Sequence, residues 1–257
     1  MRVLRLLLES GPSWAIMAEQ GVRPIAVSPF GGPPQLAGDV VPVTAARLLP
    51  PVAPSKIFAV GRNYADHAAE MGLPVGDEPA IFLKPPSTLL QPGSPVVLPD
   101  PSISVEVEHE AELAVVVGAV LKRAGTEEAS HAIFGFTCAN DVSARDLQRT
   151  DAHITRAKGF DTFCPLGPWI ETDLPPIPNL QVQCRVNGEL RQAANTSEML
   201  YDVPSLLAHI SQWATLLPGD VVLTGTPAGT GRLRDGDHVE IEIDRLGLLS
   251  HGVARRV

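Results

Sequence analysis

Residues 105–117 read VEVEHEAELAVVV, which is the pattern of a β-strand that runs from the surface into a core. Charged and apolar side chains alternate at first, and residues 113–117 are then continuously apolar. Because successive side chains of a strand point to opposite faces, the alternation predicts four carboxylates on one face. These are Glu106, Glu108, Glu110 and Glu112. The apolar end is typical of a strand that is buried on both faces.

Short strands and few helices are predicted on both sides of this stretch. Apolar runs bounded by Gly and Pro predict strands at residues 2–8, 14–19, 23–28, 56–60, 221–224, 239–243 and 248–253. Asn187-Gly188 favours a hairpin turn, and helices are expected at residues 64–71 and 205–216. With Pro 25 and Gly 22 in 257 residues, the chain is rich in turns. The expected fold class is α+β and mainly β, with residues 1–52 as a small β domain and 53–257 as the main domain.

The composition excludes several classes of protein. Hydrophobic residues make up 44% of the chain, which suits a globular core and rules out general disorder. Lys+Arg 20 against Asp+Glu 29 gives a net charge of −9, which argues against nucleic acid or an anionic membrane as a partner. No apolar run approaches the roughly 20 residues that span a bilayer. Cys138, Cys164 and Cys184 are odd in number and lack CxxC spacing, so we expect no disulfide framework, no zinc site and a cytoplasmic location.

Glu110 and Glu112 lie where the predicted strand turns apolar, and a carboxylate that enters a core must be paired, protonated or bound to a metal. Oxygen ligands select hard cations such as Mg²⁺, with Mn²⁺ and Ca²⁺ as alternatives. Asp141 follows the apolar run 133–138 and offers a further carboxylate. The alternatives are a solvated acidic edge for the glutamates and a turn or helix N-cap for Asp141. The spacing alone leaves open which of the four glutamates bind a metal.

Imidazole and basic side chains supply the other candidate site residues. His67 and Glu70 are three apart on a predicted helix, so they are neighbours, and a carboxylate raises the basicity of an imidazole. Lys84 and Lys158 lie among apolar residues and could bind a carboxylate or stabilise an oxyanion. The alternatives are an ordinary surface His–Glu pair and lysines whose ammonium groups reach water. The loop TGTPAGTG at residues 224–231 offers N–H groups for an anion but lacks the spacing of a nucleotide-binding loop.

Six segments together resemble the fumarylacetoacetate hydrolase family. They are VGRNYADHAAEMG (60–72), PAIFLKPPSTL (79–89), EAELAVVVG (110–118), GFTCANDVSARDLQ (135–148), RAKGFDTFCPLGPWI (156–170) and VVLTGTPAGTG (221–231). The resemblance implies a fold of mixed, rolled β-sheets around a divalent-metal site, and a homodimer. It covers about residues 56–231, so it says little about the N-terminal β appendage.

The resemblance also assigns roles to individual residues. The implied metal ligands are Glu110, Glu112 and Asp141. His67 and Glu70 match the catalytic dyad of the family, on a segment that covers the substrate, and Lys158 matches its active-site lysine. The positions implied to line the substrate pocket are Arg145, Gln148 and Thr226, and we add Lys84 from its own apolar surroundings. Glu106 and Glu108 fall outside the motif and are expected to be solvated.

The family acts on small 2-oxo acids that carry a second carbonyl or carboxylate. The resemblance therefore implies an enzyme for a 2-oxo acid or dicarboxylate, in which Mg²⁺ or Mn²⁺ stabilises an enolate as a neighbouring C–C bond breaks. Our first expectation is an acylpyruvate or fumarylpyruvate hydrolase, with water activated by His67 and Glu70. An oxaloacetate decarboxylase and a 2-hydroxyhepta-2,4-diene-1,7-dioate isomerase stay open at the same site. The alternative of another class is a non-catalytic metal-binding protein, which we would expect to lack His67, Glu70 or Lys158.

Overall fold

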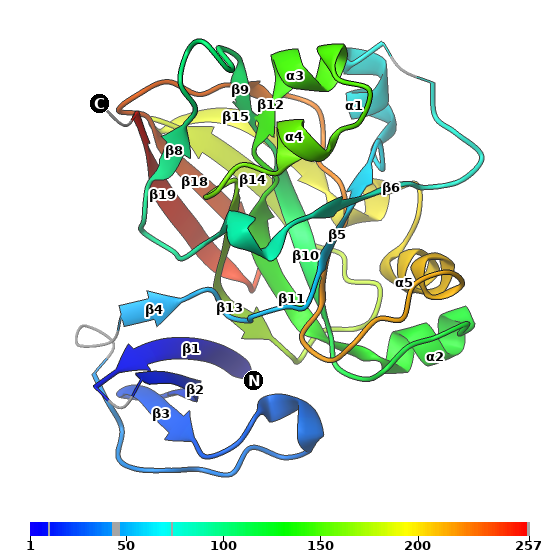
Figure 1. The fold of residues 1–257 in the computed structure, drawn as a ribbon. Helices are drawn as coiled ribbons and strands as arrows, with labels where there is room; N and C mark the ends of the chain where they lie inside the picture. Colours follow the sequence, from blue (N-terminus) through cyan, green and yellow to red (C-terminus); the bar gives the residue numbers. More distant parts are fainter. Residues whose placement is uncertain (10, 43–46, 73, 256–257) are drawn as a thin grey trace.

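The computed structural model describes residues 1–9, 11–42, 47–72 and 74–255, and over these ranges the chain is built mainly from strands (Figure 1). The helices are short: α1 Ala65–Glu70, α2 Thr126–His131, α3 Arg145–Thr150, α4 Thr155–Lys158 and α5 Val203–Ser211. The strands are β1 Arg2–Leu8, β2 Gly11–Ala18, β3 Gly21–Ile25, β4 Arg47–Leu49, β5 Ile57–Gly61, β6 Ala80–Lys84, β7 Leu89–Leu90, β8 Val96–Leu98, β9 Val107–His109, β10 Ala111–Val117, β11 Ile133–Asn140, β12 Ser143–Ala144, β13 Cys164–Glu171, β14 Gln181–Val186, β15 Glu189–Asn195, β16 Val221–Leu223, β17 Gly231–Arg232, β18 His238–Ile243 and β19 Gly247–Arg255. The predicted fold class, mainly β with few helices, is confirmed. Among the described helices, none has the length and apolar character needed to span a membrane.

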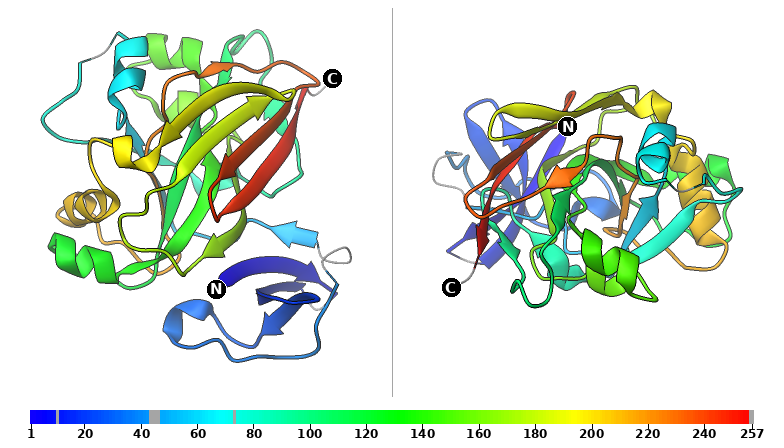
Figure 2. Two further views of the ribbon diagram at one scale, coloured as in Figure 1. Left: turned by 180° about the vertical axis from the view of Figure 1, so that it is seen from behind. Right: turned by 90° about the horizontal axis from the view of Figure 1, so that it is seen from above.

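The strands form sheets of mixed direction. The largest sheet runs in the order β3-β2-β1-β13-β11-β10-β16-β5-β6, and smaller sheets have the orders β12-β9-β17 and β15-β14-β18-β19-β8. Most neighbours are antiparallel, but β5 and β16 are parallel, as are β8 and β19. In the left view of Figure 2, the yellow and red strands of β14, β15, β18 and β19 cross in front of the green strands of the large sheet. The main hydrophobic core lies between these two layers, where β10 and β11 meet β14 and β18.

The first strands extend one edge of the large sheet. β1 pairs with β13, with Val3 opposite Ile170, and β2, β3 and β4 continue outward from β1. In Figure 1 these blue strands lie below the rest of the molecule, beside the end of β13. The division of the chain into residues 1–52 and 53–257 stays a prediction.

Residues 105–117 form two strands, not the single strand that was predicted. β9 ends at His109 in a small sheet, and β10 begins at Ala111 in the large sheet. Between them, the N–H of Glu110 donates to Oδ1 of Asn140 at 2.9 Å instead of to a neighbouring strand. The prediction of one continuous strand was therefore wrong. The prediction that its apolar end is buried on both faces is confirmed, because every residue of β10 is buried.

The helix predicted at residues 205–216 begins earlier and is shorter. α5 follows Asp202, whose side chain accepts a hydrogen bond from the N–H of Ser205 at 2.9 Å. It ends at Ser211, so Trp213 and Leu217, which continued the helical pattern, lie beyond it and are exposed. The apolar spacing alone therefore predicted a helix that extends too far at its C-terminal end.

The pairing of β10 with β11 brings the acidic residues together. Ala111 lies opposite Asn140 and Glu112 lies opposite Ala139 in this antiparallel pair. Asp141 follows β11 directly, and its N–H donates to the carbonyl of Glu110 at 2.9 Å. One end of this strand pair therefore carries the three carboxylates predicted as metal ligands.

Candidate active site

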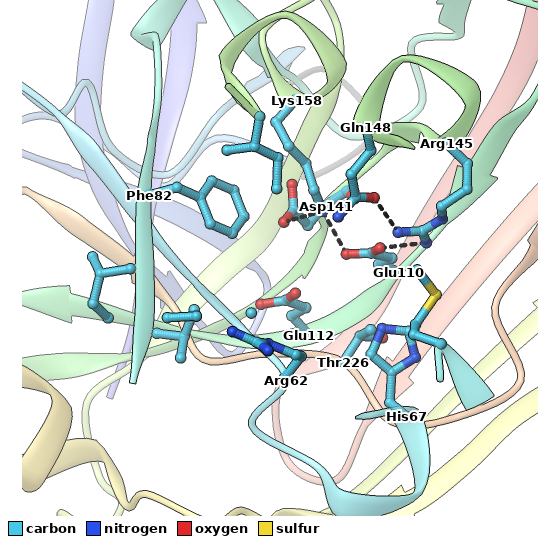
Figure 3. A pocket seen from close by; sticks show the side chains of 16 residues that line it. Arg62, His67, Phe82, Glu110, Glu112, Asp141, Arg145, Gln148, Lys158 and Thr226 are labelled. Carbon is cyan, nitrogen blue, oxygen red and sulfur yellow. Dashed lines mark hydrogen bonds and ion pairs between the residues drawn. The ribbon is translucent and has the colours of Figure 1, made fainter. Parts of the chain in front are cut away.

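Three buried carboxylates form the centre of the site (Figure 3). Glu110, Glu112 and Asp141 each offer an oxygen, and these oxygens lie within 4.8 Å of one another. All three residues are at most 4% exposed. Carboxylates that are packed so closely repel each other unless a cation or a proton neutralises them. Strand alternation alone left open which of the four glutamates bind a metal. The structure brings together the three carboxylates that the family resemblance implied as ligands.

Two lysines neutralise part of this charge. Lys158, at the end of α4, places Nζ at 2.6 Å from Glu110 Oε2 and at 2.7 Å from Asp141 Oδ2. The Nζ of Lys84 lies 2.7 Å from Asp141 Oδ1, an ion pair without the alignment of a hydrogen bond, and donates to the carbonyl of Lys158 at 2.6 Å. Lys84 is 1% exposed, so the alternative of an ammonium group in water is wrong for it. It lies behind Asp141 and is not among the residues that line the cavity described below.

Glu110 and Glu112 have opposite electrostatic settings. Burial would raise the pKa of Glu110, but the ammonium of Lys158 and the guanidinium of Arg145 hold it well below its ordinary value. Burial, Asp141 and Glu110 together raise the pKa of Glu112 well above its ordinary value. Glu112 accepts one hydrogen bond, from the N–H of Gly225 at 2.7 Å, and no lysine or arginine pairs with it in the described part of the chain. The site therefore lacks positive charge at Glu112.

A divalent cation fits this deficit. Without one, burial and the neighbouring carboxylates favour a proton on Glu112, and a cation among the three oxygens would replace that proton. The donors are all carboxylate oxygens, which suit Mg²⁺, Mn²⁺ or Ca²⁺ and not a soft metal. The buried triad thus has the chemistry of a divalent-metal site. That these three residues are the ligands stays a prediction.

The His67–Glu70 pair predicted from the helical spacing exists on α1. Nδ1 of His67 lies 3.1 Å from Oε2 of Glu70, and the same carboxylate accepts from the N–H of Gly229 at 3.0 Å. Because a carboxylate only accepts, Nδ1 carries a proton and Nε2 is left for other contacts. His67 lines the cavity, whereas Glu70 is 37% exposed at its side chain and acts on the cavity only through His67.

The cavity above the triad has a volume of about 350 Å³. Its polar and charged walls are Arg62, His67, Glu110, Glu112, Asp141, Arg145, Gln148, Lys158 and Thr226, and its apolar walls include Met71, Ile81, Phe82 and Ile154. Ten residues were singled out above as ligands, catalytic groups or substrate contacts, and eight of them line this one cavity. The other two, Lys84 and Glu70, contact residues that line it. Figure 3 shows Lys158 and His67 on opposite sides of this space.

Several of these side chains are already occupied by the protein itself. Arg145 donates to Glu110 Oε1 at 2.6 Å and to the amide oxygen of Gln148 at 2.5 Å, so the Gln148 Nε2 is the donor left for a ligand. Thr226 donates its hydroxyl hydrogen to the carbonyl of Ala111 at 2.9 Å. Its oxygen is then available to a ligand as an acceptor only.

Arg62 was missed by the sequence analysis. It follows β5 with a φ of 59°, and its Nη1 donates to the carbonyl of Pro74 at 2.8 Å. Its side chain lines the same cavity as Glu112, and Figure 3 shows both. Its position within the segment VGRNYADH next to the dyad was the available signal. Arg62 adds a cation to the wall of the cavity.

Glu108 is not solvated as expected, whereas Glu106 stays partly exposed, in a surface ion pair. Nε of Arg145 lies 2.7 Å from Glu108 Oε2, and the hydroxyl of Thr230 donates to the same oxygen at 3.3 Å. Glu106 pairs with Arg149, whose Nη1 donates to Oε1 at 3.1 Å. The expectation was wrong for Glu108, because α3 follows the short strand β12, which pairs with β9 and brings both arginines alongside the glutamates.

Comparison with known proteins identifies the family of this chain. Residues 56–254 match the family model described as fumarylacetoacetate (FAA) hydrolase, C-terminal, and residues 1–51 match Rv2993c-like, N-terminal. Protein Rv2993c of Mycobacterium tuberculosis is 44% identical, over 100% of this chain and 99% of the relative. The human mitochondrial oxaloacetate tautomerase FAHD2A is 43% identical, over 91% of this chain and 77% of the relative.

Among solved structures, 5-carboxymethyl-2-hydroxymuconate delta-isomerase from Mycobacterium smegmatis has a TM-score of 0.92 and 43% identity, covering 100% of both chains. The family model spans most of the chain, and these relatives cover nearly all of it at more than 40% identity. The resemblance stated from six sequence segments is thereby confirmed. This chain belongs to the fumarylacetoacetate hydrolase family, and its N-terminal segment is of the Rv2993c-like type.

Proposed function

We propose that this enzyme moves a proton next to the 2-oxo group of a small 2-oxo dicarboxylate, as a tautomerase or isomerase. The observation that carries the proposal is a cavity of about 350 Å³ with three buried carboxylates at its centre and the imidazole of His67 on its wall. Such an arrangement offers one site to hold a chelating acid and one base to take its proton. The names of two relatives, an oxaloacetate tautomerase and a delta-isomerase of a carboxylic acid, describe isomerisations of small acids and support it.

Glu110, Glu112 and Asp141 are the proposed ligands of Mg²⁺ or Mn²⁺. When bound, the cation supplies Lewis acidity that polarises a 2-oxo group and lowers the free energy of the negative charge that develops on it. Lys158 keeps Glu110 and Asp141 ionised and in place, because its Nζ pairs with both. Lys84 and Arg145 hold the outer oxygens of Asp141 and Glu110 in the same way.

His67 is the proposed base. Its Nδ1–H points to Glu70, so Nε2 can take the proton from the carbon next to the 2-oxo group and the C–H electron pair moves toward the carbonyl. Glu70 stabilises the imidazolium that results and fixes the ring, while the Gly229 N–H fixes Glu70. Nε2 then returns the same proton to the oxygen or to the next carbon, so the reaction is balanced without water.

Arg62 is the proposed contact for the second carboxylate of the substrate. Its guanidinium lines the cavity and pairs with no carboxylate in the described part of the chain. A guanidinium is suited to binding a carboxylate through two parallel hydrogen bonds. A dicarboxylate is therefore favoured over an acylpyruvate with an apolar tail.

Hydrolysis is the second candidate, as first expected from the sequence. It requires a water molecule that His67 deprotonates and that attacks a distal carbonyl. The 37% exposure of the Glu70 side chain favours it, because water can reach this side of the dyad. Decarboxylation would need neither proton abstraction from carbon nor water at His67.

Ultraviolet absorption of the enol separates these reactions. We would add the keto form of oxaloacetate, or acetylpyruvate, with Mg²⁺ or with EDTA, and measure pyruvate formation in parallel. Metal-dependent keto–enol equilibration of oxaloacetate without pyruvate, lost in His67→Ala and weakened in KM by Arg62→Ala, is the expected result. Cleavage of acetylpyruvate would instead support the hydrolase, and pyruvate from oxaloacetate in His67→Ala the decarboxylase. Failure of all reactions with Mg²⁺ present would contradict the proposal.

A further inference from the structure

A second cavity, of about 280 Å³, lies beside the strand that leads into the active site. None of the residues that line it lines the catalytic cavity. His109, the residue before Glu110, reaches into it from β9, and the other principal wall residues are Arg191 of β15, Arg232 of β17 and Arg234. A cluster of three guanidinium groups is notable in a chain with a net charge of −9.

The residues that line this cavity carry three guanidinium groups and the single carboxylate of Asp237, an excess of positive charge, while Glu106, outside the lining, attracts Arg232. Asp237 lines it, but Oδ1 accepts from the amide of Asn187 at 2.9 Å and Oδ2 from the N–H of Arg234 at 2.6 Å. Arg191 pairs with Glu189 at 2.9 Å, and both side chains are well exposed, so this pair contributes little. Neither Arg232 nor Arg234 forms an ion pair with a carboxylate in the described part of the chain.

His109 is the buried polar group of this cavity, with 1% of its surface exposed. Its Nδ1 lies 3.0 Å from the side-chain oxygen of Gln192, which can only accept, so Nδ1 carries the proton. Nε2 of the neutral ring is therefore an acceptor. It lies next to Gly231, where an added Cβ would come within 3.3 Å of it, so the missing side chain leaves Nε2 open on this side.

We propose that this cavity is a binding site for a small oxyanion that also carries an O–H group, such as hydrogen phosphate or a hydroxycarboxylate. The arginines donate to its charged oxygens, and its O–H donates to Nε2 of His109. A volume of about 280 Å³ equals roughly nine water molecules at ~30 Å³ each, which suits such an ion and excludes a nucleotide. Sulfate, which has no proton at neutral pH, binds less tightly.

Gln192, which accepts from His109, also connects this cavity to the active site. Gln192 donates to the hydroxyl of Thr226 at 2.8 Å and to the carbonyl of Pro227 at 2.8 Å. Further along this loop, Gly229 packs so closely on the carbonyl of Arg191 that a Cβ there would lie 2.1 Å from it. Residues 225–231 thus contact both cavities, because Thr226 lines the first and Gly231 lines the second. An occupied second cavity reduces the motion of this loop.

The test uses the full chain in EDTA at fixed ionic strength, so that neither turnover nor a metal contributes. Titration calorimetry with inorganic phosphate should detect binding to the wild type, and Arg232→Gln/Arg234→Gln should bind at least tenfold more weakly. Arg62→Gln is the matched control, since it removes an arginine from the catalytic cavity only, and it should bind phosphate like the wild type. Hydrogen exchange at residues 225–232 should slow on adding phosphate to the wild type and not to the double variant.

Gly231→Ala provides a second variant that keeps all three arginines. Its methyl group would crowd Nε2 of His109, so phosphate binding should weaken while the fold is retained. Malate is the probe for the second class of ligand, the hydroxycarboxylates. If malate binds to the wild type and not to the double variant, the site also accepts hydroxycarboxylates. Equal phosphate and malate affinities in the wild type and the double variant would overturn the proposal, as would a loss confined to Arg62→Gln. Sulfate binding as tight as phosphate would refute the role of the O–H group.

Discussion

Lys158→Met tests whether the three carboxylates form a cation site. In the wild type, the ammonium of Lys158 contacts Glu110 and Asp141 at 2.6 and 2.7 Å, and all three groups are buried. Methionine keeps most of the volume but removes the charge, so each of the two ionised carboxylates loses one partner and keeps one, Arg145 at Glu110 and Lys84 at Asp141. Without a metal, the folded state must then bind a proton there or lose stability.

The expected magnitude follows from burial. Removing one partner of a buried ion pair costs about 3–5 kcal/mol. This cost is an upper limit here, because Arg145 and Lys84 still pair with the two carboxylates. For a chain of this size, 1 kcal/mol corresponds to about 2–4 °C in Tm, so the loss in EDTA should be no more than roughly 6–20 °C. With Mg²⁺ the positive charge is restored, and no ammonium repels the cation, so the variant should gain more in Tm from Mg²⁺ than the wild type does.

Lys56→Met is the matched control. Lys56 also pairs with a buried carboxylate, that of Asp220. Asp220 contacts Val117, at the end of β10 that lies away from the triad. Without Lys56, Asp220 keeps hydrogen bonds from Ser55 and Leu217. Thermal melts of the three proteins in EDTA and in saturating Mg²⁺ give the comparison. Mg²⁺ should raise the Tm of Lys158→Met by more than it raises the Tm of the wild type or of Lys56→Met. If Mg²⁺ raises the Tm of none of the three proteins, the carboxylates do not hold the cation, and an equal rise in all three would show that the charge of Lys158 does not affect its binding.

Three further predictions concern the same site. Glu112→Ala should abolish binding of Mg²⁺ or Mn²⁺ measured by calorimetry, because it removes one of three carboxylates, and unchanged affinity would exclude Glu112 as a ligand. His67→Ala should lower kcat by about 10²–10⁴-fold if Nε2 moves the proton, and a wild-type rate would remove it from the mechanism. Burial and its carboxylate neighbours raise the pKa of Glu112. Above the pKa of this group in the unfolded chain, the folded metal-free protein therefore holds a proton that the unfolded chain has released. The free energy of unfolding in EDTA should then fall as pH rises above the unfolded pKa. Because Mg²⁺ must displace that proton, the difference in Tm between Mg²⁺ and EDTA should widen from about pH 5 to pH 8, and a constant difference would contradict this.

Local features of the fold could be predicted from the sequence because they depend on neighbouring residues. Asn187 and Gly188 have φ values of 53° and 79° between β14 and β15, as the predicted type I′ turn requires. The His67–Glu70 contact likewise follows from positions three apart on one helix. Contacts between distant segments could not be predicted in this way. The pairing of Arg145 with Glu108 depends on how β12 lies against β9, which no local pattern encodes.

The break between β9 and β10 gives Glu110 and Glu112 different partners. Where the chain passes from one sheet to another, the N–H groups of Glu110 and Ala111 have side-chain partners in place of a neighbouring strand, and buried N–H groups must be satisfied. Asn140 accepts from the first at 2.9 Å and Gln192 from the second at 3.0 Å. These two amides therefore allow the change of sheet inside the core. Glu110 and Glu112 still face one site, and the break lets Glu110 reach both Lys158 and Arg145 while Glu112 faces the N–H of Gly225. The neutral residues Asn140 and Gln192, which are not themselves candidate ligands or catalytic groups, thus determine the geometry of the candidate metal site.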